Sequence, residues 1–207
     1  MDPQVLLKGT VLGFSIAAPV GPIGVLCIRR SLGEGRLAGF LSGLGAATAD
    51  AIYGAIAALG LTAISSLLLG AKFWLALVGG LFLLYLGVRT LLAKPKPRTE
   101  AEVDASPAPG RTGLWAAFFS TLGLTLTNPM TILAFTAMFA GMGPSGAPGS
   151  LVLGVFLGSA AWWWILSALA DRFRKLLGGA GLLWVNRVSG CVIAGFGLMA
   201  LASAIKG

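Results

Sequence analysis

The sequence predicts an all-α membrane protein whose six transmembrane helices form an inverted 3+3 repeat with broken first and fourth helices. Three observations support this fold class. Of the 207 residues, 57% are hydrophobic and 11% are charged, compared with about 45–50% and about 25% in soluble domains. The apolar residues gather into segments of roughly 20 residues, the length that crosses a bilayer as a helix. Finally, prolines interrupt the first and fourth segments at matching positions.

Six segments have the length and composition of transmembrane helices. The third is followed by a stretch rich in proline, charge and small residues at 94–110, which is typical of a flexible, solvent-exposed linker. We therefore divide the chain into a first three-helix repeat at 1–93, a cytoplasmic linker at 94–113 and a second, inverted repeat at 114–207. The predicted spans lie near residues 4–28, 38–64, 72–92, 114–140, 150–170 and 183–205.

The two halves correspond at a shift of 110 residues, which places Pro19 on Pro129 in the middle of the first and fourth spans. Because each unit has an odd number of spans, the second unit must lie upside down relative to the first. Inverted repeats with broken helices at corresponding positions are typical of transporters. The glycine pairs that coincide at this shift are Gly13 and Gly123, Gly33 and Gly143, Gly39 and Gly149, Gly80 and Gly190, and Gly87 and Gly197.

The distribution of basic residues predicts the orientation in the membrane. All of the 15 lysines and arginines except Lys8, Lys72 and Lys206 lie in, or next to, the three connections on one side. The positive-inside rule places that side in the cytoplasm and both termini in the periplasm. The net charge of +8 therefore indicates topology and contact with anionic lipid rather than nucleic-acid binding. We expect Arg29 and Arg30 to contribute to this lipid-facing charge.

Proline and glycine predict backbone breaks at the centre of the membrane, because proline removes a helical hydrogen bond and clashes with the preceding turn. Freed backbone groups are tolerated there only inside protein or around a wet cavity. A helix N-terminus favours a carboxylate and freed carbonyls favour an ammonium, so the two breaks suit an amino-acid zwitterion. The alternative is a pair of packing kinks satisfied by Ser and Thr side chains. The residues concerned are Pro19, Gly21, Pro22, Thr127, Asn128 and Pro129.

Asp50 lies near the middle of the apolar stretch 39–69, which holds no other charged residue. An ionisable residue at that depth is a functional-site hypothesis by default. Because burial disfavours the charged form of a carboxyl group, Asp50 is a candidate to bind a substrate ammonium, to carry a coupling proton, or to alternate between them. The alternative is a structural carboxylate bonded to a broken-helix backbone. Its helix face is made of small residues and one tyrosine, Gly39, Gly43, Ala46, Ala47, Tyr53 and Gly54.

Three consecutive tryptophans, Trp162 to Trp164, lie in the fifth predicted span. They are explained by an interfacial aromatic belt or by packing, or by an indole face, that of Trp163, against a substrate cation. Three consecutive positions cannot all face one cavity. At most one or two of them are therefore expected to line a substrate site.

Several kinds of chemistry lack their usual residues in this sequence. It holds no histidine, no GxxxxGK[ST] motif and no CxxC, so it predicts neither an enzyme nor a cofactor or metal site. Cys27 and Cys191 are expected to be buried small apolar residues. Three alternatives stay open: an exporter of an inorganic or heavy-metal cation, which would need several thiols or carboxylates together; a thiol-redox conduit, which would need the two cysteines within disulfide reach; and a structural membrane subunit.

The segments APVGP at 18–22 and GRLAG at 35–39, followed by the intramembrane Asp50, resemble the N-terminal half of the lysine exporter (LysE/RhtB) family. The segment TNP at 127–129 is similar to that family's TNPK-like segment, although Met130 stands where many relatives have lysine.

The resemblance implies an inner-membrane exporter of amino acids or close derivatives, driven by protons or membrane potential. Family substrates include basic amino acids, threonine, homoserine and homoserine lactone. The resemblance also implies that Asp50 and the residues of both breaks are functional. We therefore expect a secondary transporter, and its small-residue helix faces would allow a homodimer.

Overall fold

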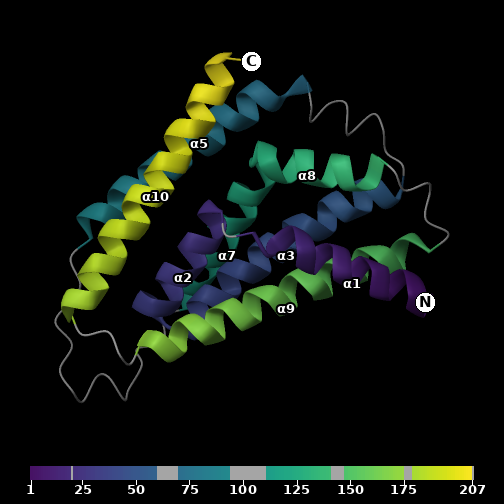
Figure 1. Cartoon of the computed structure of the whole chain (residues 1–207), viewed down its shortest axis with the longest axis horizontal. Helices are drawn as coiled ribbons and strands as arrows, with labels where there is room; N and C mark the ends of the chain where they lie inside the picture. The colour runs from purple at the N-terminus through teal and green to yellow at the C-terminus, as the bar shows by residue number, and fades with distance from the viewer. Residues whose placement is uncertain (20, 60–69, 94–110, 141–146, 175–178, 207) are drawn as a thin grey trace.

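The computed structural model describes residues 1–19, 21–59, 70–93, 111–140, 147–174 and 179–206, and in these ranges the chain is helical without a strand (Figure 1). This agrees with the predicted all-α class. The linker at 94–110 and the end of the second predicted span lie outside the described residues. The helices are α1 (Pro3–Ala17), α2 (Pro22–Glu34), α3 (Arg36–Ala58), α5 (Lys72–Leu92), α7 (Arg111–Leu126), α8 (Pro129–Ala140), α9 (Pro148–Arg174) and α10 (Gly179–Lys206).

Four helices in the described part of the chain are long and apolar enough to cross a membrane, namely α3, α5, α9 and α10. A fifth span is obtained if α1 and α2, which meet at an angle of 82°, are counted as one broken span. The predicted fourth span, 114–140, is divided between α7 and α8, which are each too short to count by the same test. The six-span arrangement therefore stays a prediction.

Glycines set the closest helix contacts. Helix α1 packs against α9, with Gly9 against Leu151 and Gly13 against Val155. Because both residue numbers rise together along the contact, the two helices are parallel. A side chain at Gly13 would overlap the carbonyl oxygen of Val155. Helix α3 runs parallel to α7 and antiparallel to α9. These contacts bring α1, α3, α7 and α9 together, with α2 beside α3.

Helices α5 and α10 form an antiparallel pair that lies to one side of the other helices (Figure 1). A Cβ on Gly80 would lie 3.1 Å from the carbonyl oxygen of Gly197, and one on Gly190 would lie 2.8 Å from that of Gly87. Close approach of this kind is characteristic of small residues in membrane helices. The pair meets the rest of the protein through α2 and α7, in a cluster that contains Leu26, Leu124 and Ile193.

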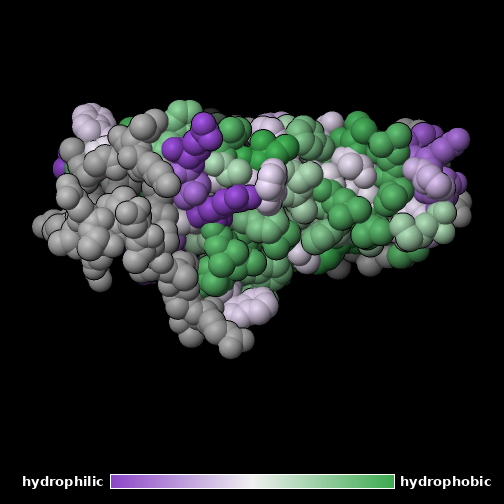
Figure 2. All heavy atoms as spheres, turned by 90° about the horizontal axis from the view of Figure 1, so that it is seen from below, coloured by the Kyte–Doolittle hydropathy of each residue, from purple (hydrophilic) through white to green (hydrophobic). Residues whose placement is uncertain are grey.

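The surface of the described residues is mainly apolar. Figure 2 shows a broad hydrophobic band across one face, with hydrophilic residues gathered at one end and in a second patch toward the other end. Large apolar side chains such as Trp74 and Met199 are 64% and 68% exposed. An apolar outer surface of this extent is the expected property of a protein whose helices face lipid.

Candidate transport site around Asp50

Asp50 is buried in the interior of the helix bundle, as its small-residue face predicts. Its side chain is 3% exposed. The hydroxyl of Ser159 donates a hydrogen bond of 2.7 Å to Oδ2 of Asp50. The indole Nε1 of Trp163 donates to the same hydroxyl oxygen at 3.1 Å. Ser159 and Trp163 are one turn apart on α9. Helix α9 therefore contacts the carboxyl group of α3 through two consecutive hydrogen bonds, from Trp163 to Ser159 and from Ser159 to Asp50.

Small residues on α3 allow this arrangement. The Trp163 side chain covers Gly43 so closely that any Cβ at that position would overlap it. At Gly54 a Cβ would lie 3.5 Å from a methyl group of Val155, so α9 follows α3 closely on either side of Asp50. Only such close approach brings a side chain as short as serine within hydrogen-bond distance of Asp50.

Tyr53 links the helix of Asp50 to the second break. Its hydroxyl donates a hydrogen bond of 2.6 Å to the carbonyl oxygen of Leu126, the last residue of α7. Its ring packs against Phe135 of α8, with the centroids 5.6 Å apart. Since Asp50 and Tyr53 are three residues apart and share one face of α3, the α7–α8 break lies next to the face that carries the carboxyl group.

The first break leaves a helix N-terminus without a side-chain cap. Helix α1 ends at Ala17, and α2 begins at Pro22 with Gly21 as its N-cap residue, which has no side chain to accept a hydrogen bond. Ile23, in the first turn of α2, packs in one cluster with Ala46, which precedes Asp50 by one turn of α3. The open N-terminus of α2 and the carboxyl group therefore lie at a similar depth. Pro19 is exposed.

The second break is closed by its own residues. Asn128 accepts a hydrogen bond of 3.1 Å from the backbone N–H of Met130 through Oδ1, which is the geometry of an N-cap. Pro129 follows as the first residue of α8, where its missing N–H costs nothing. The hydroxyl of Thr127 donates 2.9 Å to the carbonyl oxygen of Gly123. At the second break, side chains therefore form hydrogen bonds with backbone groups next to the break, as in the alternative that we considered for both breaks.

The three tryptophans point in different directions. Trp163 is buried and contacts Ser159, whereas Trp162 packs edge-on against Phe14 with centroids 5.4 Å apart. Trp164 is half exposed and lies beneath the guanidinium of Arg36, 4.8 Å from its ring centroid. Only Trp163 therefore reaches the surroundings of Asp50, and it does so through its N–H group.

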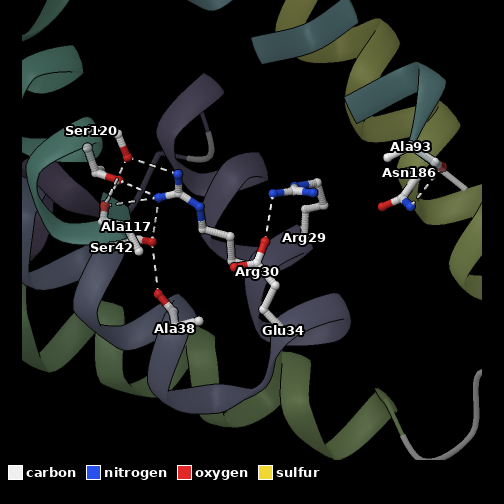
Figure 3. Close-up of polar contacts among 10 residues, drawn as sticks. Arg29, Arg30, Glu34, Ala38, Ser42, Ala93, Ala117, Ser120 and Asn186 are labelled. Carbon is white, nitrogen blue, oxygen red and sulfur yellow. Dashed lines mark hydrogen bonds and ion pairs between the residues drawn. The ribbon is translucent and has the colours of Figure 1, made fainter. Parts of the chain in front are cut away.

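Arg30 departs from the expectation for the basic residues. We expected both Arg29 and Arg30 to face water or lipid headgroups, and for Arg30 this is wrong. Arg29 forms an ion pair of 2.9 Å with Glu34 on its own helix, whereas Arg30 is only 7% exposed and extends toward α7 (Figure 3). Its acceptors come from α3 and α7, which sequence adjacency alone does not reveal. They are Ser42 Oγ, Ala117 O, Thr121 Oγ1 and Ser120 Oγ.

The cysteines and carboxylates give no support to the alternative chemistries. Cys27 is buried, but Cys191 is exposed, so the expectation that both are buried is wrong for Cys191. Both thiols are free. Among the described residues, no three His, Cys, Asp or Glu side chains come together in a way that would hold a metal ion.

Long apolar helices, glycine-mediated packing and a carboxyl group enclosed between helices define a multi-pass α-helical membrane protein with polar side chains buried among its helices. The chain belongs to the family of LysE type translocators, whose family model matches residues 14–204. It is therefore a transporter and not an enzyme.

Two relatives extend this result. The chain is 28% identical over 204 residues, covering 94% of this chain and 93% of the relative, to the Bacillus subtilis (strain 168) protein named "Putative amino acid efflux protein YcgF". It is 29% identical over 178 residues, covering 83% of this chain and 77% of the relative, to "Uncharacterized membrane protein YahN" of Escherichia coli (strain K12). No solved structure matches the chain.

Proposed function

We propose that this chain is a secondary transporter that exports amino acids or close derivatives across the bacterial inner membrane. The observation that carries the proposal is the burial of Asp50 on α3, at a depth similar to that of the uncapped N-terminus of α2, which packs on the same helix. The family and the relative named for amino acid efflux support the same substrate class. Proton or membrane-potential coupling is part of the proposal.

The site suits a zwitterion because it offers one group for each charge. The carboxylate of Asp50 would bind the substrate ammonium. The backbone N–H groups in the first turn of α2, including that of Ile23, would bind the substrate carboxylate, since a helix N-terminus carries unpaired donors and a partial positive charge. Tyr53 of α3, Thr127 of the second break and Trp163 of α9 would contact the substrate in this proposal.

Proton coupling would use the same carboxyl group. A buried carboxylate is stabilised by a proton or by a bound cation, so proton and substrate ammonium would occupy Asp50 in alternation. Ser159 keeps one oxygen of the group in a fixed position through its 2.7 Å hydrogen bond. The other oxygen would then be the one that exchanges its partner.

Helix directions support the proposed inverted 3+3 repeat. At the shift of 110 residues α1 corresponds to α7, α3 to α9 and α5 to α10. The last two pairs are antiparallel, and α1 runs with α9 while α7 runs with α3, so α1 and α7 also point in opposite directions. In the proposed cycle the two repeats rock around Asp50, with both termini in the periplasm.

Export of an inorganic or heavy-metal cation is the less favoured function. Such a cargo needs several soft or anionic ligands in one place, and among the described residues Asp50 is paired with a hydroxyl rather than with a second ligand of that kind. A thiol-redox conduit has no support either, since one thiol is buried and the other exposed.

The proposal is tested by efflux from proteoliposomes that contain the purified protein and a labelled amino acid, with an imposed proton gradient or membrane potential. Asp50→Asn is expected to reduce efflux by at least about tenfold, the loss expected when a charged hydrogen bond to the substrate is removed. Asp104→Asn removes a carboxylate from the linker sequence and is expected to leave efflux unchanged. Full efflux by Asp50→Asn, with equal yield and a single elution peak, would contradict the proposal.

A further inference from the structure

The buried guanidinium of Arg30 has only uncharged partners among the described residues. Nη1 donates to Ser42 Oγ at 2.7 Å and to Thr121 Oγ1 at 3.0 Å, and Nη2 donates to Ser120 Oγ at 2.9 Å (Figure 3). The remaining acceptor is the carbonyl oxygen of Ala117, at 3.0 Å from Nη1. Burying a cation is costly unless an anion compensates it. In the described chain the nearby carboxylate of Glu34 is paired with Arg29 instead.

The hydroxyl partners are arranged as acceptors. Ser42 donates its own proton to the carbonyl of Ala38 at 2.8 Å, so its lone pairs are left for the guanidinium. On α7, Thr121 and Ser120 both donate to the carbonyl of Ala117, at 2.9 and 3.1 Å. Each hydrogen bond from Arg30 is therefore one to a neutral oxygen. A carboxylate would form bonds about twice as strong, and in a bidentate geometry.

Arg30 contacts the helix of Asp50 at a different level along its axis, through Ser42. Ser42 and Asp50 lie on the same helix and are eight residues apart, which corresponds to about 12 Å along the axis. Arg30 lies on the side of Asp50 that carries the α2–α3 turn, which is the cytoplasmic side in the proposed orientation. It also bridges α2 and α3 of the first repeat to α7 of the second.

We propose that Arg30 is a specificity-determining residue that binds the carboxylate of the exported compound on the cytoplasmic side of Asp50, before that carboxylate passes to the N–H groups of α2. The inference rests on the proposed function and deepens it, because it restricts the substrate class to compounds with a free carboxylate. The substrate carboxylate replaces all three α7 acceptors, Ser120 Oγ, Thr121 Oγ1 and the carbonyl oxygen of Ala117, as partners of the guanidinium. This exchange releases Arg30 from α7, so the first and second repeats are free to separate on the cytoplasmic side only when a suitable compound is present.

The experiment compares amino acids with their primary amides, which keep the ammonium and lose the negative charge. The probes are L-lysine and L-lysinamide, L-threonine and L-threoninamide, and L-leucine and L-leucinamide. In proteoliposomes we measure KM for each acid and the inhibition constant of each amide. For the transported acid, the wild-type protein is expected to prefer the acid by at least about tenfold, and Arg30→Gln is expected to remove most of that preference by raising KM for the acid alone.

A second variant separates recognition from structure. Ser120→Ala removes one neutral competitor for the guanidinium and is expected to lower KM for the acid, whereas a purely structural role of the cluster predicts no gain in affinity. Ser203→Ala, which removes an exposed hydroxyl bonded only to its own helix, is the matched control and is expected to leave both constants unchanged. If Arg30→Gln does not fold, Ser120→Ala alone decides the question.

The outcomes distinguish this inference from the proposed function. Two results would overturn the role of Arg30 while leaving amino-acid export intact. The first is equal affinity of the wild-type protein for acids and amides. The second is an equal loss of affinity for acids and amides in Arg30→Gln. An unchanged KM in Ser120→Ala would count against it in the same way. If the wild-type protein moves none of the acids, the proposed function fails and this inference fails with it.

Discussion

The hydroxyl of Ser159 donates a 2.7 Å hydrogen bond to Oδ2 of Asp50, although 109 residues separate them in the sequence. The bond joins α3 to α9, which correspond to each other in the proposed repeat. The carboxyl group belongs to one half of the chain and its hydrogen-bond donor to the other. Any relative movement of the two halves at this level therefore changes the surroundings of Asp50.

Ser159→Ala tests the importance of this bond. The substitution removes a hydrogen bond to a carboxyl group and leaves the Trp163 N–H without its acceptor, so kcat/KM for efflux is expected to fall about tenfold, in line with about 1.5–3 kcal/mol for a bond to a charged group. Ser167→Ala is the matched control on the same helix, because the Ser167 hydroxyl is fully buried without a partner in the described chain. Equal effects of the two variants would show that the Asp50 contact is not used.

Tyr53→Phe tests the link between α3 and the second break. The variant keeps the ring packing against Phe135 and loses only the hydrogen bond to Leu126 O, so a loss of about 1 kcal/mol in the free energy of unfolding is expected. Unfolding in detergent, followed by circular dichroism, measures this change. Tyr85→Phe is the control, since Tyr85 is 56% exposed and stacks on Phe82 with an interplanar angle of 22°. A greater loss of unfolding free energy in Tyr85→Phe than in Tyr53→Phe would contradict the hydrogen bond between Tyr53 and Leu126.

Gly13→Ala and Gly123→Ala form a matched pair at corresponding positions of the two proposed repeats. A methyl group at Gly13 would overlap the backbone of Val155, and relief of that overlap is expected to cost about 1–3 kcal/mol of unfolding free energy. At Gly123 a Cβ meets nothing within 4 Å, so the helix propensity of alanine is expected to add about 0.5–1 kcal/mol. Melting temperatures in detergent should therefore change in opposite directions. A shift of the same sign in both variants would contradict the close α1–α9 contact.

The orientation is tested by labelling single cysteines with a membrane-impermeant maleimide. The background is Cys191→Ser, since Cys27 is buried. Gln4→Cys, at an exposed position of α1, is expected to react in intact cells because the N-terminus is proposed to be periplasmic. Arg172→Cys, exposed at the end of α9, is expected to react only after permeabilisation. The reverse pattern would place both termini in the cytoplasm.

The burial of Asp50 and the two helix breaks could be predicted from the sequence because each depends on local chemistry. Proline in the interior of a helix removes a backbone hydrogen bond and clashes with the preceding turn, so it kinks or ends the helix there. A face of glycine and alanine also predicts close packing, whichever helix packs against it. The partners of Asp50 could not be predicted, because Ser159 is one of many small residues on α9 and its contact depends on the register between two distant helices.

The contacts of Arg30 could not be predicted from the sequence either. Arg29 and Arg30 are adjacent and chemically identical, yet one pairs with Glu34 and the other is buried. The difference arises because residues next to each other on a helix point about 100° apart, so only one of them faces α7. Hydroxyl residues clustered at 120–121 on α7 were the available signal, but a run of Ser and Thr is common in membrane helices and does not name its partner.

The N-termini of α2 and α8 differ in their capping, and this difference predicts how many substrate molecules each polypeptide binds. Two identical halves would have two equivalent uncapped helix N-termini and would bind two substrate molecules at once. Here Oδ1 of Asn128 accepts a hydrogen bond from one N–H in the first turn of α8, that of Met130, whereas Gly21 has no side chain to cap α2. Equilibrium dialysis should therefore give a molar binding ratio of one per polypeptide, the number expected if the two halves of the proposed repeat have diverged.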